Sequence, residues 1–86
     1  MPNKVTDTSP RAVNDALELR ELLESGAARR IRLAADIPLR VVAADCHADP
    51  VSVHRWETGL SRPKGARATA YLACLRKMAR ALEASS

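Results

Sequence analysis

Residues 37–59, Ile-Pro-Leu-Arg-Val-Val-Ala-Ala-Asp-Cys-His-Ala-Asp-Pro-Val-Ser-Val-His-Arg-Trp-Glu-Thr-Gly, decide the fold of this chain. Pro38 ends the helix that precedes it, because the residue before a proline is biased away from helical geometry. Asp49 is followed by proline, and a capping residue followed by proline typically starts a helix. We therefore predict two short helices, at about 39–46 and 50–57, joined by about three residues.

Two short helices with so brief a connection have the proportions of a helix-turn-helix unit. Outside this unit we predict helices at about 10–24, 27–36 and 66–83, because Ala, Leu, Arg and Glu dominate and strand-forming residues are sparse. The first nine residues are expected to form a flexible arm, and residues 10–86 a single domain. The residues expected to face the core from these three helices are Ala12, Ala16, Leu19, Leu22, Leu23, Ala28, Ile31, Leu33, Ala34, Ala35, Ala68, Tyr71, Leu72, Leu75, Met78, Ala79 and Leu82.

The length of 86 residues permits one domain with a small core and leaves no room for a large catalytic cavity. Hydrophobic residues make up 47% and charged residues 28%, a balance typical of a globular chain. No stretch approaches the roughly 18 consecutive apolar residues of a membrane span, and the first residues lack the apolar run of a signal peptide. We therefore expect a cytoplasmic protein without a membrane partner, in which Cys46 and Cys74 stay reduced.

Charge is unevenly distributed along the chain. Residues 1–28 carry three bases and five acids, a net charge of −2, whereas residues 29–86 carry eleven bases and five acids, a net charge of +6. This asymmetry indicates an anionic partner for the second part of the chain. Charge alone leaves both nucleic acid and a membrane surface open.

The most specific part of the pattern is Trp56-Glu57-Thr58-Gly59 followed by Arg62-Pro63. Together with Arg32 and residues 37–43, it resembles the lambda repressor/Cro-type helix-turn-helix family over roughly residues 28–83. The resemblance implies an all-α, compact bundle of about five helices that contains a helix-turn-helix. It also implies a sequence-specific transcriptional regulator that binds double-stranded DNA, as a phage-type repressor or Cro-like protein does. The Ala- and Arg-rich composition is typical of high-GC coding and suggests an actinobacterium or its phage.

Four residues are expected to hold the unit together. Trp56, the only tryptophan, should pack a large area into a core that has no Phe. Gly59 follows a helix end, where left-handed backbone geometry favours glycine. The resemblance implies that Arg32 and Glu57 form a partly buried salt bridge between the second and fourth helices. The alternative for this pair is two solvated surface charges.

The resemblance also implies that the N-terminal end of the helix at 50–57 faces base edges in the major groove. The expected base-contacting residues are Pro50, Val51, Ser52 and Arg55. Arg55 is the best candidate for a bidentate contact, because its planar fork matches O6 and N7 of guanine. Val51 fits a thymine methyl group, whereas a serine hydroxyl distinguishes bases poorly. The alternative for Arg55 is a solvated helix arginine.

Contacts to the DNA backbone are expected from polar and basic residues around the same helix. These are Arg40, His54, Thr58, Arg62, Lys64 and Arg67. Any one basic residue in a loop is often simply solvated, but their clustering beside a helix-turn-helix favours phosphate contacts for the group.

Three positions depart from the family. Pro38 replaces the usual Ser or Thr cap, Leu39 replaces a frequent Gln, and His47 stands where the turn usually has Gly. Histidine adopts left-handed geometry less readily than glycine, at modest cost. The departures concern the phosphate contacts rather than the fold.

Catalytic and metal sites are not expected. Four possible metal ligands lie close in sequence, but their spacing matches no strong zinc signature. They are Cys46, His47, Asp49 and His54. The chain has no glycine-rich phosphate loop, no paired-carboxylate cleft and no Ser-His-Asp set. We therefore expect no enzyme, no cofactor and no small-molecule ligand.

Other functions stay open. Within DNA binding, the alternatives are an antitoxin and an excisionase-like protein; outside it, the alternative is a helical interaction module whose acidic first helix binds a protein. The apolar side of the helix at 10–24 packs either within its own domain, near Tyr71, Leu75 and Met78, or against a second copy in a homodimer formed at least on DNA. Packing within the domain is favoured, because a monomer of this size buries little surface and the helix then adds to that core without needing a partner.

Overall fold

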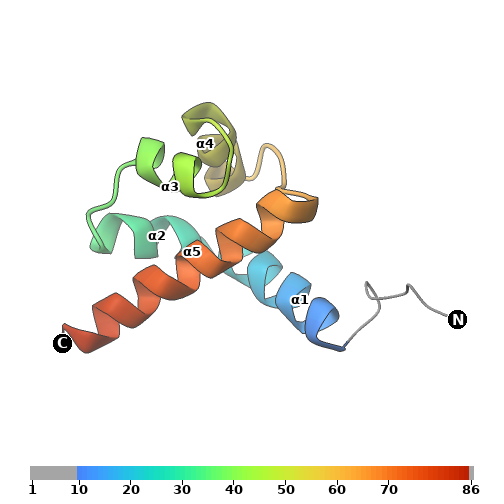
Figure 1. Ribbon diagram of the computed structural model, residues 1–86, viewed down its shortest axis with the longest axis horizontal. Helices are drawn as coiled ribbons and strands as arrows, with labels where there is room; N and C mark the ends of the chain where they lie inside the picture. Colours follow the sequence, from blue (N-terminus) through green and yellow to red (C-terminus); the bar gives the residue numbers. More distant parts are fainter. Residues whose placement is uncertain (1–9, 86) are drawn as a thin grey trace, which may run out of the picture.

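Residues 10–85 form five helices in the computed structural model, which describes this part of the chain (Figure 1). The helices are α1 (Pro10–Glu24), α2 (Ala27–Ala34), α3 (Leu39–Asp45), α4 (Pro50–Thr58) and α5 (Gly65–Ala84). Residues 10–85 contain no strand, so the predicted all-α class is confirmed. The expected arm at residues 1–9 lies outside the described residues.

Three of the helices end in the same backbone arrangement, although only one of them has glycine there. Asp36 and His47, two residues beyond the ends of α2 and α3, and Gly59, directly after α4, adopt positive φ angles of 59°, 57° and 81°. The amides that follow them, at Ile37, Ala48 and Leu60, donate to the carbonyls of Arg32, Ala43 and Arg55 at 3.2, 2.9 and 2.9 Å. These Schellman-type ends satisfy carbonyls that have no partner inside the helix. The motif also ends α2 two residues earlier than Pro38 alone predicts.

The longest helix, α5, runs across the molecule and contacts α1, α2 and α3 (Figure 1). α1 and α2 also contact each other, whereas α3 and α4 lie together at the top of Figure 1. The main backbone contacts of α4 are with α3. The position of α4 relative to the rest of the domain therefore depends on α3 and on individual side chains.

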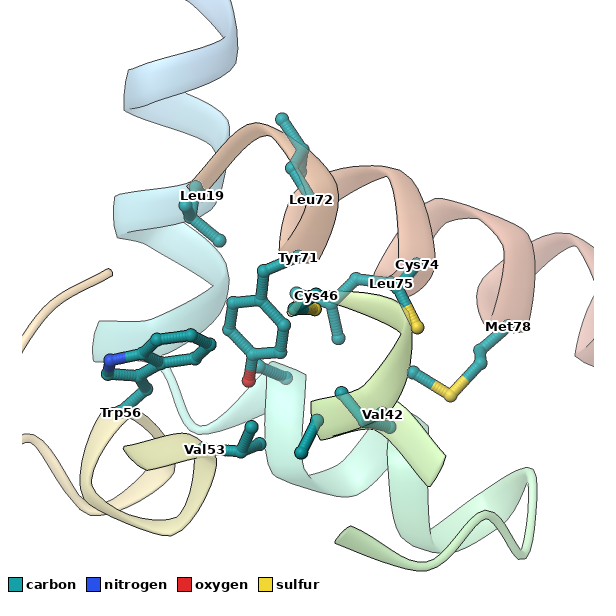
Figure 2. Packing of buried hydrophobic residues seen from close by; sticks show 12 residues of the cluster. Leu19, Val42, Cys46, Val53, Trp56, Tyr71, Leu72, Cys74, Leu75 and Met78 are labelled. Atoms are coloured by element: carbon teal, nitrogen blue, oxygen red, sulfur yellow. The ribbon is translucent and has the colours of Figure 1, made fainter. Parts of the chain in front are cut away.

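The core lies between α5 and the other helices (Figure 2). Its buried apolar residues are Leu19, Ala28, Val42, Ala43, Cys46, Val53, Trp56, Tyr71, Leu72, Cys74, Leu75 and Met78. The Trp56 and Tyr71 ring centroids are 5.0 Å apart with 48° between the ring planes, a tilted arrangement that aromatic pairs favour. Because the chain has no Phe, these two rings supply the aromatic volume of the core, and aliphatic and sulfur-containing side chains fill the remaining space.

Three residues that were expected to face the core are exposed instead: Ala16, Leu33 and Ala34. Leu33 is 49% exposed. The buried residues of α2 are Ala28 and, one turn later, Arg32. Residues four apart share a helix face, so burying Arg32 turns Leu33 to the surface. The prediction for Leu33 is wrong because the centre of the inner face belongs to a charged residue.

The acidic helix α1 packs within its own domain, against α2 and α5. Leu19 is buried, and Leu22 and Leu23 are partly buried against the same core. The opposite side of α1 leaves Val13 52% and Leu17 55% exposed. Packing within the domain, the favoured alternative for this helix, therefore covers one side of α1 and not the other.

The core predicts the effect of one conservative substitution. The Tyr71 hydroxyl is buried and has no hydrogen-bond partner among residues 10–85; burial also raises the Tyr71 pKa above its ordinary value, so the group stays protonated. Tyr71→Phe removes this unsatisfied group and keeps the ring beside Trp56, so we expect the free energy of unfolding to rise by about 1 kcal/mol in chemical denaturation. A clear loss of stability would contradict the assignment and would mean that the hydroxyl has a partner.

Candidate nucleic-acid interface

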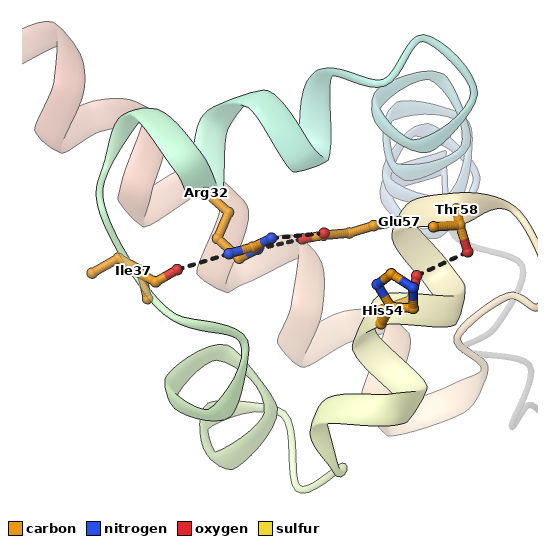
Figure 3. A network of polar contacts seen from close by, with 5 residues as sticks. All are labelled: Arg32, Ile37, His54, Glu57 and Thr58. Carbon is orange, nitrogen blue, oxygen red and sulfur yellow. Dashed lines mark hydrogen bonds and ion pairs between the residues drawn. The ribbon is translucent and has the colours of Figure 1, made fainter.

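A buried ion pair joins α2 to α4 (Figure 3). Arg32 donates from Nε to Oε2 of Glu57 at 2.5 Å and from Nη2 to Oε1 at 2.9 Å. Its Nη1 donates to the carbonyl oxygen of Ile37 at 3.1 Å, in the segment that leads into α3. The side chains of Arg32 and Glu57 are 10% and 1% exposed. One guanidinium thus links α2, α4 and the start of α3, and the pair that the resemblance implied is present.

The ion pair orients α4 more than it stabilises the fold. Two parallel hydrogen bonds fix the direction of the carboxylate as well as its distance. The hydrogen bonds that Arg32 donates to Glu57 raise the pKa of Arg32 above its ordinary value, which keeps the guanidinium charged. Burying two charges removes them from water, so the net gain is small while both partners are present. Val53 and Trp56, also buried, complete the inner face of α4.

The turn between α3 and α4 is held from both of its ends. Asp49 caps α4, accepting a hydrogen bond from the Ser52 amide at 2.8 Å and one from the Ser52 hydroxyl at 3.3 Å. Arg67, at the start of α5, donates from Nε to the carbonyl oxygen of His47 at 3.1 Å. The left-handed residue in the turn, His47, is therefore bonded to the helix that follows α4.

The outer face of α4 is exposed along its whole length. Around the helix, Pro50, Val51, His54, Arg55 and Thr58 form one continuous exposed side, with Val51 58% exposed. Ser52 lies at the edge of this side, half-buried, with its hydroxyl donated to the capping carboxylate. The expected base-contacting residues therefore lie on one accessible face, apart from Ser52, whose hydroxyl is already engaged.

Two of the positions at which the sequence departs from the pattern it resembles lie at the start of α3. Pro38 caps the helix without a side-chain hydrogen bond, and Leu39 packs partly buried against the core. Neither residue therefore supplies a polar group at this helix end. Arg40 is the exposed basic side chain there.

The basic residues near α4 fall into two groups. Arg40, Arg55 and Lys64 are exposed and form no ion pair with another residue of the described range 10–85. In contrast, Arg62 donates to Glu24 at 2.8 Å, and Arg67 is bonded to the turn. The first group carries uncompensated positive charge beside the exposed face of α4.

The Thr58 hydroxyl is also engaged within its own helix. It donates to the carbonyl oxygen of His54 at 3.0 Å, with Arg55 O at 3.3 Å (Figure 3). A contact from this hydroxyl to a phosphate would have to replace that bond.

Sequence reasoning missed the contribution of Glu24 entirely. Its pairing with Arg20 four residues earlier is visible in the sequence, but its contact with Arg62 depends on the fold.

Other kinds of site have little support among the described residues. A groove of about 280 Å³ between α1 and α5 is lined largely by apolar side chains, including Ala12, Leu19 and Leu72. Burial raises the thiol pKa of Cys46 and of Cys74 to about 11, so neither is a ready nucleophile. Residues 10–85 hold no cluster of three or more His, Cys, Asp or Glu side chains that could bind a metal ion. Within the same range, no helix combines the length and the apolar character needed to span a bilayer.

Comparisons of the chain with protein-family models, curated proteins and solved structures give no match.

The buried ion pair predicts the effect of removing one partner. Glu57→Ala leaves the Arg32 guanidinium in the interior with only the Ile37 carbonyl, so we expect the free energy of unfolding to fall by about 3 kcal/mol, measured by chemical denaturation. Because the pair is shielded from solvent, the loss should persist in high salt. Glu21→Ala, which removes an exposed carboxylate of α1, is the control and should have little effect. If Glu57→Ala behaved like the control, the ion pair would not hold α4.

Proposed function

We propose that α3, the turn after it and α4 form a helix-turn-helix, and that the chain is a sequence-specific regulator of transcription that binds double-stranded DNA. The observation that carries this proposal is the division of α4 into two faces. Val53, Trp56 and Glu57 hold the inner face in the core, while Val51 and Arg55 stand exposed on the outer face. A rigid, short helix presented in this way suits insertion into the major groove.

The outer face of α4 carries chemistry suited to base edges. The guanidinium of Arg55 can donate two hydrogen bonds to O6 and N7 of a guanine. Val51, one turn earlier, offers an apolar surface to a thymine methyl group. Ser52 contributes mainly to the cap of α4, so we assign base recognition to Val51 and Arg55 ahead of Ser52.

Contacts to the DNA backbone are assigned to residues that lie beside Val51 and Arg55. Arg40 at the start of α3 and Lys64 before α5 are exposed cations on segments adjoining α4, and both suit phosphate oxygens. His54, exposed on α4, can add a further contact. In this proposal Arg67 acts first as a brace for the turn and only secondarily on DNA, because its Nε already donates to His47.

The regulator is proposed to act as a phage-type repressor or Cro-like protein, as the resemblance implies. Antitoxin and excisionase-like roles use the same DNA-binding chemistry and stay as alternatives. The DNA target itself is best obtained by selecting bound sequences from a random duplex library, whose symmetry also reports whether one or two copies bind.

A second candidate is a helical interaction module that binds a protein through α1. The exposed apolar side chains of Val13 and Leu17, on a helix rich in acidic residues, favour it. Salt separates the two proposals: binding to a random-sequence duplex should weaken steeply as salt rises if the chain is a DNA-binding protein. No affinity for duplex DNA at low salt would favour the interaction module.

The DNA-binding proposal predicts a specific loss at one base pair. Arg55→Ala should weaken binding to the selected site by about 1–3 kcal/mol and relax the preference at one G·C pair, measured by titration of labelled duplexes. Arg80→Ala, which removes the same charge from an exposed position on the last turns of α5, is the control. It should weaken binding to the selected duplex and to a random duplex only slightly. Equal losses on the selected and random duplexes would instead make Arg55 a phosphate contact.

A further inference from the structure

The last residue of α1 contacts the loop that follows α4. Oε2 of Glu24 accepts a hydrogen bond from Nη2 of Arg62 at 2.8 Å, across 38 positions of sequence. The same oxygen accepts one from Nε of Arg20, one helical turn earlier, at 3.2 Å. Arg62 lies in the loop 59–64 that follows α4, so an acidic group of α1 is paired with a cation of the candidate interface.

The contact between Glu24 and Arg62 is weak enough for Arg62 to exchange Glu24 for another acceptor. Both side chains are more than half exposed, at 52% and 59%, and exposed ion pairs are weak. If Arg62 leaves, Glu24 keeps its local partner Arg20, so no carboxylate loses all its compensation. Hydrogen bonds from Arg62 and then Arg20 lower the pKa of Glu24, so it stays ionised and remains an acceptor near neutral pH.

α1 itself does not have to move for this exchange. Arg76 of α5 donates to Asp15 at 2.8 Å and also to Glu18, which ties the middle of α1 to α5 independently of the loop. The buried side chain of Leu19 anchors the same stretch. Only the Arg62 side chain has to turn away from the helix.

We propose that Glu24 is a phosphate mimic: in the DNA-free protein its carboxylate takes the place at Arg62 that a backbone phosphate takes in the complex. This inference rests on the DNA-binding function proposed above. Carboxylate and phosphate oxygens accept the same hydrogen bonds from a guanidinium. Each binding event then has to displace Glu24 from Arg62, which lowers affinity for every duplex alike, because a phosphate contact carries no sequence information. α1 thereby lowers the affinity for non-specific DNA through this contact, in addition to the repulsion that its negative charge exerts on DNA.

The test compares Glu24→Gln with Glu21→Gln on the full chain. Both substitutions remove one negative charge from α1, but Glu21 forms no ion pair with another residue of 10–85. Titrating a random-sequence duplex at low salt, we expect Glu24→Gln to bind about 2- to 5-fold tighter than Glu21→Gln, the range set by weak exposed pairs. The advantage should shrink as salt rises, because salt weakens the contact being removed.

Arg62→Ala completes the test. This variant should bind the duplex more weakly than the wild type. Adding Glu24→Gln to Arg62→Ala should raise the affinity by no more than Glu21→Gln raises that of the wild type. Circular dichroism melting of every variant establishes that the helices remain folded. The coupling between the two positions then measures their contact directly.

Three outcomes would overturn the inference. If the wild type binds duplex DNA but Glu24→Gln only matches Glu21→Gln, the phosphate mimic is refuted and DNA binding stands. If Glu24→Gln weakens binding, the contact positions Arg62 for DNA instead of withholding it. If the wild type binds no duplex at low salt, the proposed function fails, and the inference fails with it.

Discussion

The position of α4 depends on the buried ion pair between Arg32 and Glu57. A helix of nine residues does not form stably by itself in water, so its contacts with the domain must hold it. Backbone contact with α3 and the apolar side chains on its inner face place it against the core. The bidentate bonds of Arg32 then set its rotation, because the carboxylate can accept them in few orientations. The direction in which Val51 and Arg55 point follows from this constraint.

Charge is organised around the same helix. Acidic residues of α1 pair with Arg20, Arg62 and Arg76, whereas Arg40 and Arg55 have no ion pair within the described residues. Together with Lys64, these residues place positive charge that has no ion-pair partner within residues 10–85 beside the exposed face of α4, on a chain that carries +4 overall. Positive charge on this face favours encounter with a polyanion. Of the three arginines that α1 pairs, Arg62 lies beside α4, whereas Arg20 and Arg76 lie on α1 and α5.

Much of the fold could be predicted from local signals. The Asp-Pro start of α4 and the apolar spacing of α5 are visible in the sequence, and all five helices occur near their expected positions. Two helix ends were harder to predict, because Asp36 and His47 adopt positive φ without glycine. The exposure of Leu33 and the contact between Glu24 and Arg62 depend on packing between distant segments, which no local pattern specifies. The unsatisfied Tyr71 hydroxyl has the same origin.

The most direct test of the central claim is an NMR titration of the isotope-labelled protein with a random-sequence duplex at low salt. If α4 is presented to DNA as proposed, the largest changes in backbone amide shifts should occur at residues 51–55, at the loop residues 59–62 and 64, and near Arg40. The exposed apolar side of α1, at Val13 and Leu17, should change little. Changes confined to α1, or to the last turns of α5, would contradict the account, because the oriented outer face of α4 would then have no part in binding.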